Sequence, residues 1–289
     1  MRETLLNPRD GSILRLIPDG PFLMGSTEEQ VATAAAADPE GGTFSLKHEQ
    51  PQFLAELPDF YMSIHAVTNE QYARFLSETH PSQRDLALWK PWLGDIVPPS
   101  EGCGVYRVVS GREHHPADHV SWHGAEAYCR WAGMRLPTEL EWEKGARGND
   151  GRIYPWGNEW RPDHLRWHGH RSEAETTAPV DAFLEGSSPY GLLQMAGTVE
   201  EWCADYYHAG IYRQYATGNL SPPRSGCRRV IRGGNCMRRH PLEFRCAMRR
   251  GNDPALVNIL YCGVRCALDS DPRIGSECGL ARSPALGAR

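Results

Sequence analysis

The sequence contains no long apolar run. Nowhere in its 289 residues do about 18 consecutive apolar side chains occur, which is the length a membrane-spanning helix requires. Residues 1–20 carry charges throughout and hold no apolar core of the kind found in secretory signals. We therefore expect a cytoplasmic protein with no membrane partner.

An excess of basic charge is also missing. Lys and Arg number 31 against 36 Asp and Glu, a formal net charge of -5, so there is no general electrostatic reason to bind nucleic acid. Cysteine is scarce: the chain has nine in 289 residues, and because nine is an odd number, they cannot all form pairs within one chain. A fold held together by disulfides needs a much higher density.

Glycine and proline are abundant, at 29 and 22 residues. They argue against a helical bundle and favour a fold with many turns and short strands. Residues 53–65 alternate with period two, which predicts a hairpin or two short strands around Pro58. Other short strands are expected at residues 12–17, 22–24, 190–192, 230–234, 244–247 and 263–268.

Three segments predict helices. Residues 68–80 form the first, with Thr68 as N-cap and Pro81 as the stop. The second covers residues 121–131. The third follows Thr138, which can cap it, and ends at residue 148.

Several different short motifs follow one another along the chain in a recognisable order. They are residues 22–26 (FLMGS), 67–72 (VTNEQY), 115–122 (HPADHVSW), 127–133 (AYCRWAG), 135–143 (RLPTELEWE), 154–157 (YPWG), 190–202 (YGLLQMAGTVEEW), 232–234 (RGG) and 263–267 (GVRCA). Together they resemble the formylglycine-generating enzyme, or sulfatase-modifying factor, family over residues 12–268.

The resemblance implies an α+β domain with C-type-lectin-like topology and little regular secondary structure. We expect it to cover residues 1–268, with residues 269–289 as a disordered tail. The family includes copper-dependent oxidases, iron-dependent sulfoxide synthases, inactive paralogues and the variable binding proteins of retroelements. Function must therefore be argued from the site.

The copper oxidases of this family resemble one another in two cysteines, spaced C-x4-C, soon after the Gly-Gly. Two thiolates suit the soft Cu(I) ion. Counting back from Cys246, the first position is Cys236 and the second is Pro241. Counting forward from the glycines, the positions are Arg238 and Glu243. Neither alignment provides two cysteines, so copper is not expected to bind in the usual way.

Cys236 could still act as a single ligand or nucleophile. His240 lies four residues later, a spacing that brings two side chains together only on a helix. These two residues are the candidate catalytic pair. The alternative is that Cys236 is a small residue at the edge of the cleft.

Two other metal sites are considered. His164, His168 and His170 could form a facial set for a metal such as iron, although a loop role is the simpler interpretation. The resemblance also implies a calcium site at Glu201, where Thr198 replaces the expected Asn. No cofactor follows firmly from either pattern.

A second set of histidines is spaced by four, at His115, His119 and His123. Pro116 and the helix cap at Ser121 place the first two in an extended segment. We expect them to be surface or hydrogen-bonded side chains. Among the cysteines, the resemblance implies that Cys129 and Cys266 lie close together, as thiols in a reducing compartment.

Residues 228–250 hold eight arginines and a single acid, Glu243. This contrast suggests an anionic small-molecule, peptide or protein ligand, unless the arginines pair with acids inside the fold. The candidate ligand-binding residues are Arg238, Arg239, Arg249, Arg250, Asn252, Asn258 and Tyr261.

Three functions remain open. The first is an atypical oxidoreductase of the family that acts on a small molecule or peptide through the C-terminal cleft. The second is a non-catalytic binding protein of the same fold, such as a retroelement variable protein in which residues 255–262 would be diversified. The third is a formylglycine-generating oxidase with an altered site.

Overall fold

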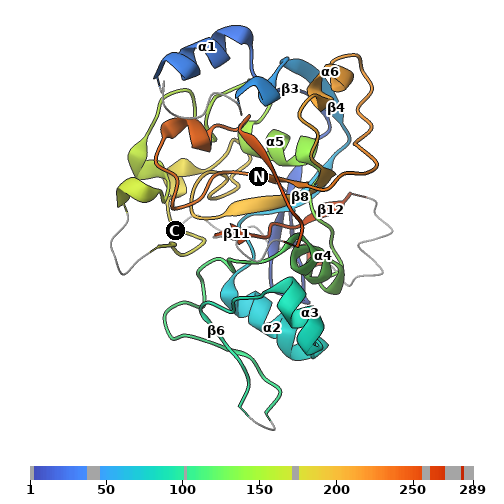
Figure 1. The fold of residues 1–289 in the computed structure, drawn as a ribbon, viewed down its shortest axis with the longest axis vertical. Helices are drawn as coiled ribbons and strands as arrows, with labels where there is room; N and C mark the ends of the chain where they lie inside the picture. Colours follow the sequence, from blue (N-terminus) through green and yellow to red (C-terminus); the bar gives the residue numbers. More distant parts are fainter. Residues whose placement is uncertain are drawn as a thin grey trace.

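The computed structural model describes residues 3–37, 46–100, 103–170, 176–255 and 261–270, and the backbone of residues 281–282. Figure 1 shows a mixed α+β arrangement in which short elements are joined by long loops. The helices are α1 (Glu28–Ala37), α2 (Asn69–Thr79), α3 (Gln83–Trp89), α4 (Trp122–Trp131), α5 (Glu139–Arg147) and α6 (Ile211–Tyr215), with 3-10 turns η1 (Leu46–Glu49), η2 (Pro162–His164), η3 (His168–His170), η4 (Leu184–Gly186) and η5 (Pro241–Phe244).

The strands form two larger sheets and two hairpin-like pairs. They are β1 (Thr4–Leu6), β2 (Ile13–Ile17), β3 (Gly20–Met24), β4 (Phe53–Leu57), β5 (Phe60–Ser63), β6 (Ile96–Val97), β7 (Arg107–Val108), β8 (Glu200–Tyr206), β9 (Arg229–Arg232), β10 (Arg249–Asn252), β11 (Cys262–Gly263), β12 (Ala267–Asp269) and β13 (Ala281–Arg282). The predicted α+β class is confirmed.

One sheet joins the two ends of the chain. Its order is β12-β5-β2-β1-β13, and every pairing in it is antiparallel. All four residues of β5 are buried, as expected for a strand that is central in the sheet and covered on both faces. The C-terminal strand β12 thus lies beside β5, about 200 residues earlier in the sequence.

The second sheet positions the candidate site. Its order is β10-β9-β8-β11, with β11 parallel to β8 and the other pairings antiparallel. Because β8 runs beside β11, Glu200 lies opposite Cys262 and Glu201 opposite Gly263. The segment that follows the Gly-Gly leaves this sheet at the end of β9 and returns to it as β10.

The three predicted helices are confirmed at α2, α4 and α5. Thr68 and Thr138 both form complete capping boxes, and the hydroxyl of Ser121 accepts the Gly124 N–H. All nine residues of α5 are buried, although five of them are charged. Such a helix requires buried partners of opposite charge.

The apolar core is divided among several clusters. The largest joins α2 and α4 to β12, and includes the buried side chains of Tyr72, Tyr128 and Trp202. A second packs α5 against β5 and β8 around Trp142. In Figure 1, α2, α3 and α4 gather at one end of the molecule, and α1, α6 and the β3–β4 pair lie at the other.

The strand predictions hold in part. Residues 53–65 form the two short strands expected around Pro58 and not a hairpin, because β4 pairs with β3 and β5 pairs with β2 and β12. Two other segments were wrongly expected to be strands. Residues 190–192 form a turn in which the Gly191 N–H donates to Ser188 O. Phe244 ends η5 and residues 245–247 form a turn, so residues 244–247 belong to no strand, although Phe244 and Cys246 are buried.

Within the described residues, no helix combines the length and apolar character needed to cross a membrane. Most of the predicted tail, residues 271–280 and 283–289, lies outside the described part. The backbone of β13 pairs with β1.

Candidate functional site

Two glycines turn the chain into the candidate cleft at the end of β9. Gly233 and Gly234 both have positive φ angles, 95° and 68°, which L side chains rarely adopt. A Cβ at Gly234 would also lie 2.7 Å from Glu243 O and 2.8 Å from the Phe244 ring. The turn therefore requires glycine, and it directs Asn235 and Cys236 into the protein.

Cys236 is fully buried, and its backbone N–H donates to Thr198 O at 3.1 Å. The chain beyond it forms turns until η5 begins at Pro241. His240 is exposed and precedes η5, where the Glu243 carboxylate accepts its backbone N–H. Because no helix spans residues 236–240, their spacing does not bring the two side chains together as a helix would. Their catalytic role stays a prediction.

A buried carboxylate, Glu200, joins several residues of the predicted cleft. Its Oε1 accepts from Arg238 Nη2 at 2.7 Å, and its Oε2 accepts from Asn235 Nδ2 at 3.1 Å. The Glu200 backbone N–H donates to Tyr261 O at 2.9 Å. Glu200 thus connects β8 to both Arg238 and Tyr261. We keep the name C-terminal cleft for the predicted site and define it by these residues together with Thr198 and Cys236.

The sequence analysis missed a polar group beside this cleft. His119 Nδ1 lies 3.1 Å from Asp118 Oδ1, and its ring contacts those of Trp92 and Tyr261, with centroids 4.1 and 5.4 Å apart. The side chain of Trp92 is 55% exposed, so its indole ring also contacts solvent. His119, expected to be a surface or hydrogen-bonded histidine, is therefore buried against aromatic rings.

Lys90 contacts Asp118, the carboxylate that lies beside His119. Its Nζ is buried and donates to Asp118 O, and burial lowers the pKa of the ammonium group to about 8. Burial alone would raise the pKa of Asp118, but the adjacent His119 imidazole and the charge of Lys90 outweigh it and lower that pKa. Asp118 is therefore ionised beside the imidazole.

Backbone strain marks the same region. Thr198, His119 and Tyr261 have φ angles of 61°, 52° and 59°, in the left-handed region that non-glycine residues rarely adopt. Such strained residues concentrate at functional sites. A positive φ angle at a non-glycine residue leaves no signal in the sequence. Thr198, His119 and Tyr261 therefore could not be predicted as a group.

The surroundings of Glu201 do not favour the calcium site predicted there. The carboxylate accepts from Nε and Nη2 of Arg265 at 2.8 to 3.0 Å and from the indole N–H of Trp142 at 2.7 Å. A guanidinium group thus takes the place that a cation would need. The buried carboxylate has its charge already compensated by protein.

The histidine set at His164, His168 and His170 is also not brought together. The ring of His164 packs on Trp156, with centroids 5.6 Å apart, and the ring of His170 stacks over Phe183. The backbone N–H of His168 donates to Arg238 O. Across the described part of the chain, no three His, Cys, Asp or Glu side chains are grouped so that they could hold a metal ion.

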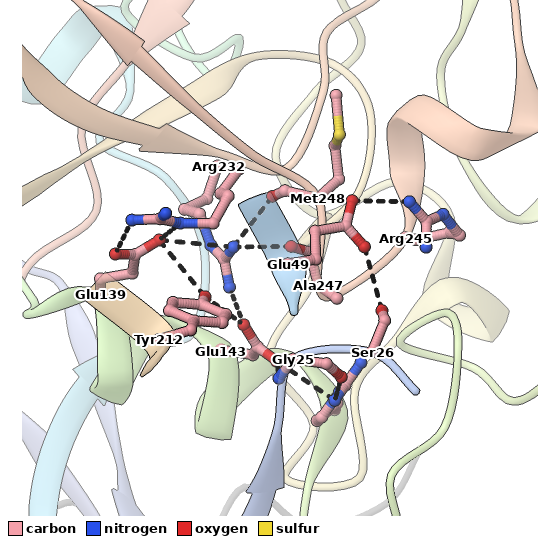
Figure 2. Close-up of polar contacts among 12 residues, drawn as sticks. Gly25, Ser26, Glu49, Glu139, Glu143, Tyr212, Arg232, Arg245, Ala247 and Met248 are labelled. Atoms are coloured by element: carbon pink, nitrogen blue, oxygen red, sulfur yellow. Dashed lines mark hydrogen bonds and ion pairs between the residues drawn. The ribbon is translucent and has the colours of Figure 1, made fainter. Parts of the chain in front are cut away.

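Most of the predicted basic surface is internal. Arg249 donates to both Glu139 oxygens at 2.6 and 2.7 Å, and Arg232 bonds Glu143 (Figure 2). Arg245 donates to Glu49 at 2.6 Å. Three of the eight arginines are thereby fully buried, and expecting Arg249 on the surface is wrong.

Helix α5 explains this arrangement. Its residues Glu139, Glu143 and Arg147 are spaced by four, so they share one face, and that face meets Arg232 and Arg249. Burial alone would raise the pKa of Glu139, but the charge of Arg249 outweighs it and lowers that pKa. The acids that neutralise these arginines lie some 100 residues away in the sequence. Counting charges within residues 228–250 therefore does not include them.

The remaining predicted residues lie at different depths. Arg239 is exposed, Arg250 pairs with Glu243 at 2.8 Å, and Asn252 is half-buried in β10. Asn258 lies outside the described residues. The Sγ atoms of Cys129 and Cys266 are 3.4 Å apart, so their expected proximity is confirmed.

Comparison with known proteins identifies the family. Residues 6–270 match the model of the sulfatase-modifying factor enzyme 1-like domain. The chain belongs to this family. It is 33% identical to the formylglycine-generating enzyme of Streptomyces coelicolor, with 90% of each protein covered.

One further relative and one solved structure resemble this chain. A serine/threonine-protein kinase pkn1 of Chlamydia caviae is 34% identical over 87% of the chain, which spans only 37% of that protein. The structure of PvdO from Pseudomonas aeruginosa superposes with a TM-score of 0.67 at 22% identity, covering 92% of this chain and 97% of that one. The latter likeness concerns the family fold alone.

Proposed function

We propose that this chain is a copper-independent family member that binds a small molecule or a peptide in the C-terminal cleft and acts on it there. One observation carries the proposal: Cys236 is buried, and residue 241, where the C-x4-C spacing would place the second cysteine, is a proline. One thiolate cannot provide the linear two-sulfur coordination that Cu(I) favours. The residues present do not fit the copper site.

The Asp118–His119 pair supports an enzymatic role. An imidazole held by an ionised carboxylate is a common general base, and here it lies against Tyr261 at the edge of the cleft. Trp92, more than half exposed, offers an aromatic surface beside it. The relative from Streptomyces coelicolor, which carries an enzyme name, also favours this role.

The alternative is a non-catalytic binding protein. This alternative is favoured because the side chains that could bind a metal or a substrate already bond to other protein groups. Glu200, Glu201 and Arg238 are examples. Metal analysis of the purified protein separates the two. Stoichiometric iron would contradict the binding-only alternative, whereas stoichiometric copper would contradict the copper-independent proposal as well. No metal after reconstitution, together with tight binding of a protein ligand that is recovered unchanged, would contradict the enzymatic role.

The copper-oxidase function is tested directly. The protein is incubated with copper, O2 and a peptide that contains Cys-x-Pro-x-Arg, and the mass of the peptide is followed. We expect no change at its cysteine, whereas the Streptomyces coelicolor enzyme serves as the positive control. Conversion of the peptide by this chain would overturn the proposal.

A further inference from the structure

A second cavity lies beside the buried ion pairs, apart from the residues that define the C-terminal cleft. It has a volume of about 340 Å³, and its polar lining consists of His48, Tyr207, Arg228, Glu243, Arg249 and Arg250. We call it the Arg228 pocket. Its size is within the range of small-molecule sites.

The only carboxylate that lines the Arg228 pocket is already engaged. Glu243 Oε1 accepts from Arg250 Nη2 at 2.8 Å. Its Oε2 accepts the backbone N–H groups of Arg239 and His240 at 3.1 and 3.2 Å. The pocket therefore offers no free carboxylate to a cationic ligand.

The arginines, by contrast, have donors to spare. Arg228 is exposed and forms no ion pair with any residue that the structure describes. Arg250 uses only Nη2 in its bond to Glu243, again judged within the described ranges. Two guanidinium groups are thus available on one side of the cavity.

His48 and Tyr207 add neutral polar groups to the lining. The Nδ1 atom of His48 lies 2.7 Å from the Tyr207 hydroxyl, and either group can be the donor. Burial raises the pKa of Tyr207, whereas burial and then the charge of Arg249 lower the pKa of His48. Neither side chain therefore adds a negative charge to the pocket at neutral pH.

The charge balance has the same sign. Three arginines, Arg228, Arg249 and Arg250, face two paired carboxylates, Glu139 and Glu243. One positive charge remains in a partly enclosed site, where electrostatic attraction is stronger than in open water. The chain as a whole is acidic, so this surplus is local.

We propose that the Arg228 pocket binds an oxyanion, the carboxylate or phosphate group of a small molecule. Arg228 and Arg250 hold the anion. Both belong to the basic segment of residues 228–250, and both line the pocket with donors that are not used in ion pairs. It does not depend on the chemistry of the C-terminal cleft.

Calorimetric titration with inorganic phosphate, pyrophosphate and succinate tests the proposal and separates phosphate from carboxylate ligands. We expect saturable one-to-one binding of at least one probe, weakened about tenfold or more in the double variant R228A/R250A, because charge-assisted hydrogen bonds are lost. The control R213A/R224A removes two exposed arginines that do not line the pocket and should bind like the unaltered protein.

Arg228→Ala alone guards against a misfolded variant, since Arg228 takes part in no ion pair of the described structure. It should weaken binding while the urea unfolding midpoint stays unchanged. Equal affinity in R228A/R250A and the unaltered protein would overturn the proposal, as would the absence of binding by all three anions.

Discussion

At the scale of single residues, Arg232 illustrates how this protein uses buried charge. It is 1% exposed, donates to the carbonyls of Ala247 and Met248, and bonds Glu143 (Figure 2). Replacing a buried ion pair as a whole can be nearly neutral, but removing one partner leaves the other charged and unpaired. The contribution of Arg232 to the free energy of unfolding is therefore set mainly by the buried carboxylates that would remain charged and unpaired without it.

Arg232→Met is expected to lower the free energy of unfolding by about 3–5 kcal/mol, because Glu143 loses its closest cation. Urea denaturation measures the change. The exposed Arg213→Ala should stay within about 0.5 kcal/mol of the unaltered protein. Equal effects of the two variants would show that the ion-paired cluster contributes nothing specific.

Asp205 predicts a pH dependence. Burial, and after it the charge of Glu139, raises its pKa from 3.8 to about 7. Between these two values the native state holds a proton that the unfolded chain has released, so this group's contribution to stability falls as pH rises from about 4 to 7. Above pH 7 the folded carboxylate carries the full cost of ionisation.

Asp205→Asn removes that titration while its side-chain oxygen can still accept the Glu139 N–H. We expect the variant to gain stability relative to the unaltered protein as pH increases, by up to about 4 kcal/mol above pH 7. Urea denaturation at pH 4.5, 6 and 7.5 provides the comparison. Parallel stability profiles would contradict the raised pKa.

At the scale of elements, the N-cap of α5 holds a helix with no exposed residue. The Thr138 hydroxyl accepts the Glu141 N–H at 3.2 Å, and Glu141 accepts the Thr138 N–H at 2.8 Å. Thr138→Ala should cost about 1–2 kcal/mol of unfolding free energy. Ser82→Ala, at the exposed N-cap of the short α3, should cost less. The opposite order would mean that burial of α5 compensates for a lost cap.

The same elements show what could be predicted from the sequence. Helices α2, α4 and α5 were found because their caps and apolar faces are local patterns. The pairing of β5 with β12 joins segments 200 residues apart, so alternation indicated the strand but not its partner. Likewise, Cys236 was placed by the family motif, whereas His119 and Asp118 matter through contacts with Trp92 and Tyr261 that only the fold creates.

At the scale of the whole molecule, the Cys129–Cys266 contact ties α4 to the C-terminal strand region, two segments 137 residues apart. Their Sγ atoms need to approach by a little over 1 Å to reach a disulfide bond length of about 2.05 Å. A crosslink across so long a loop restricts the unfolded chain strongly. The oxidation state of this pair should therefore affect the stability of the entire domain.

We expect oxidation of this pair to raise the free energy of unfolding by several kcal/mol, on the order of 4–5 by loop entropy. The experiment uses the background C103S/C227S/C278S, which removes the two exposed thiols and the one outside the described residues. Burial raises the pKa of Cys266 well above its usual value, and the hydrogen bond with Cys129 adds to this, so oxidation by diamide should be slow at pH 7 and faster at pH 9. Thiol counting by alkylation and mass, followed by urea denaturation, reports both effects, and the same background with Cys129→Ser should show neither. Stabilisation that persists in that serine variant would assign the effect to another pair of cysteines.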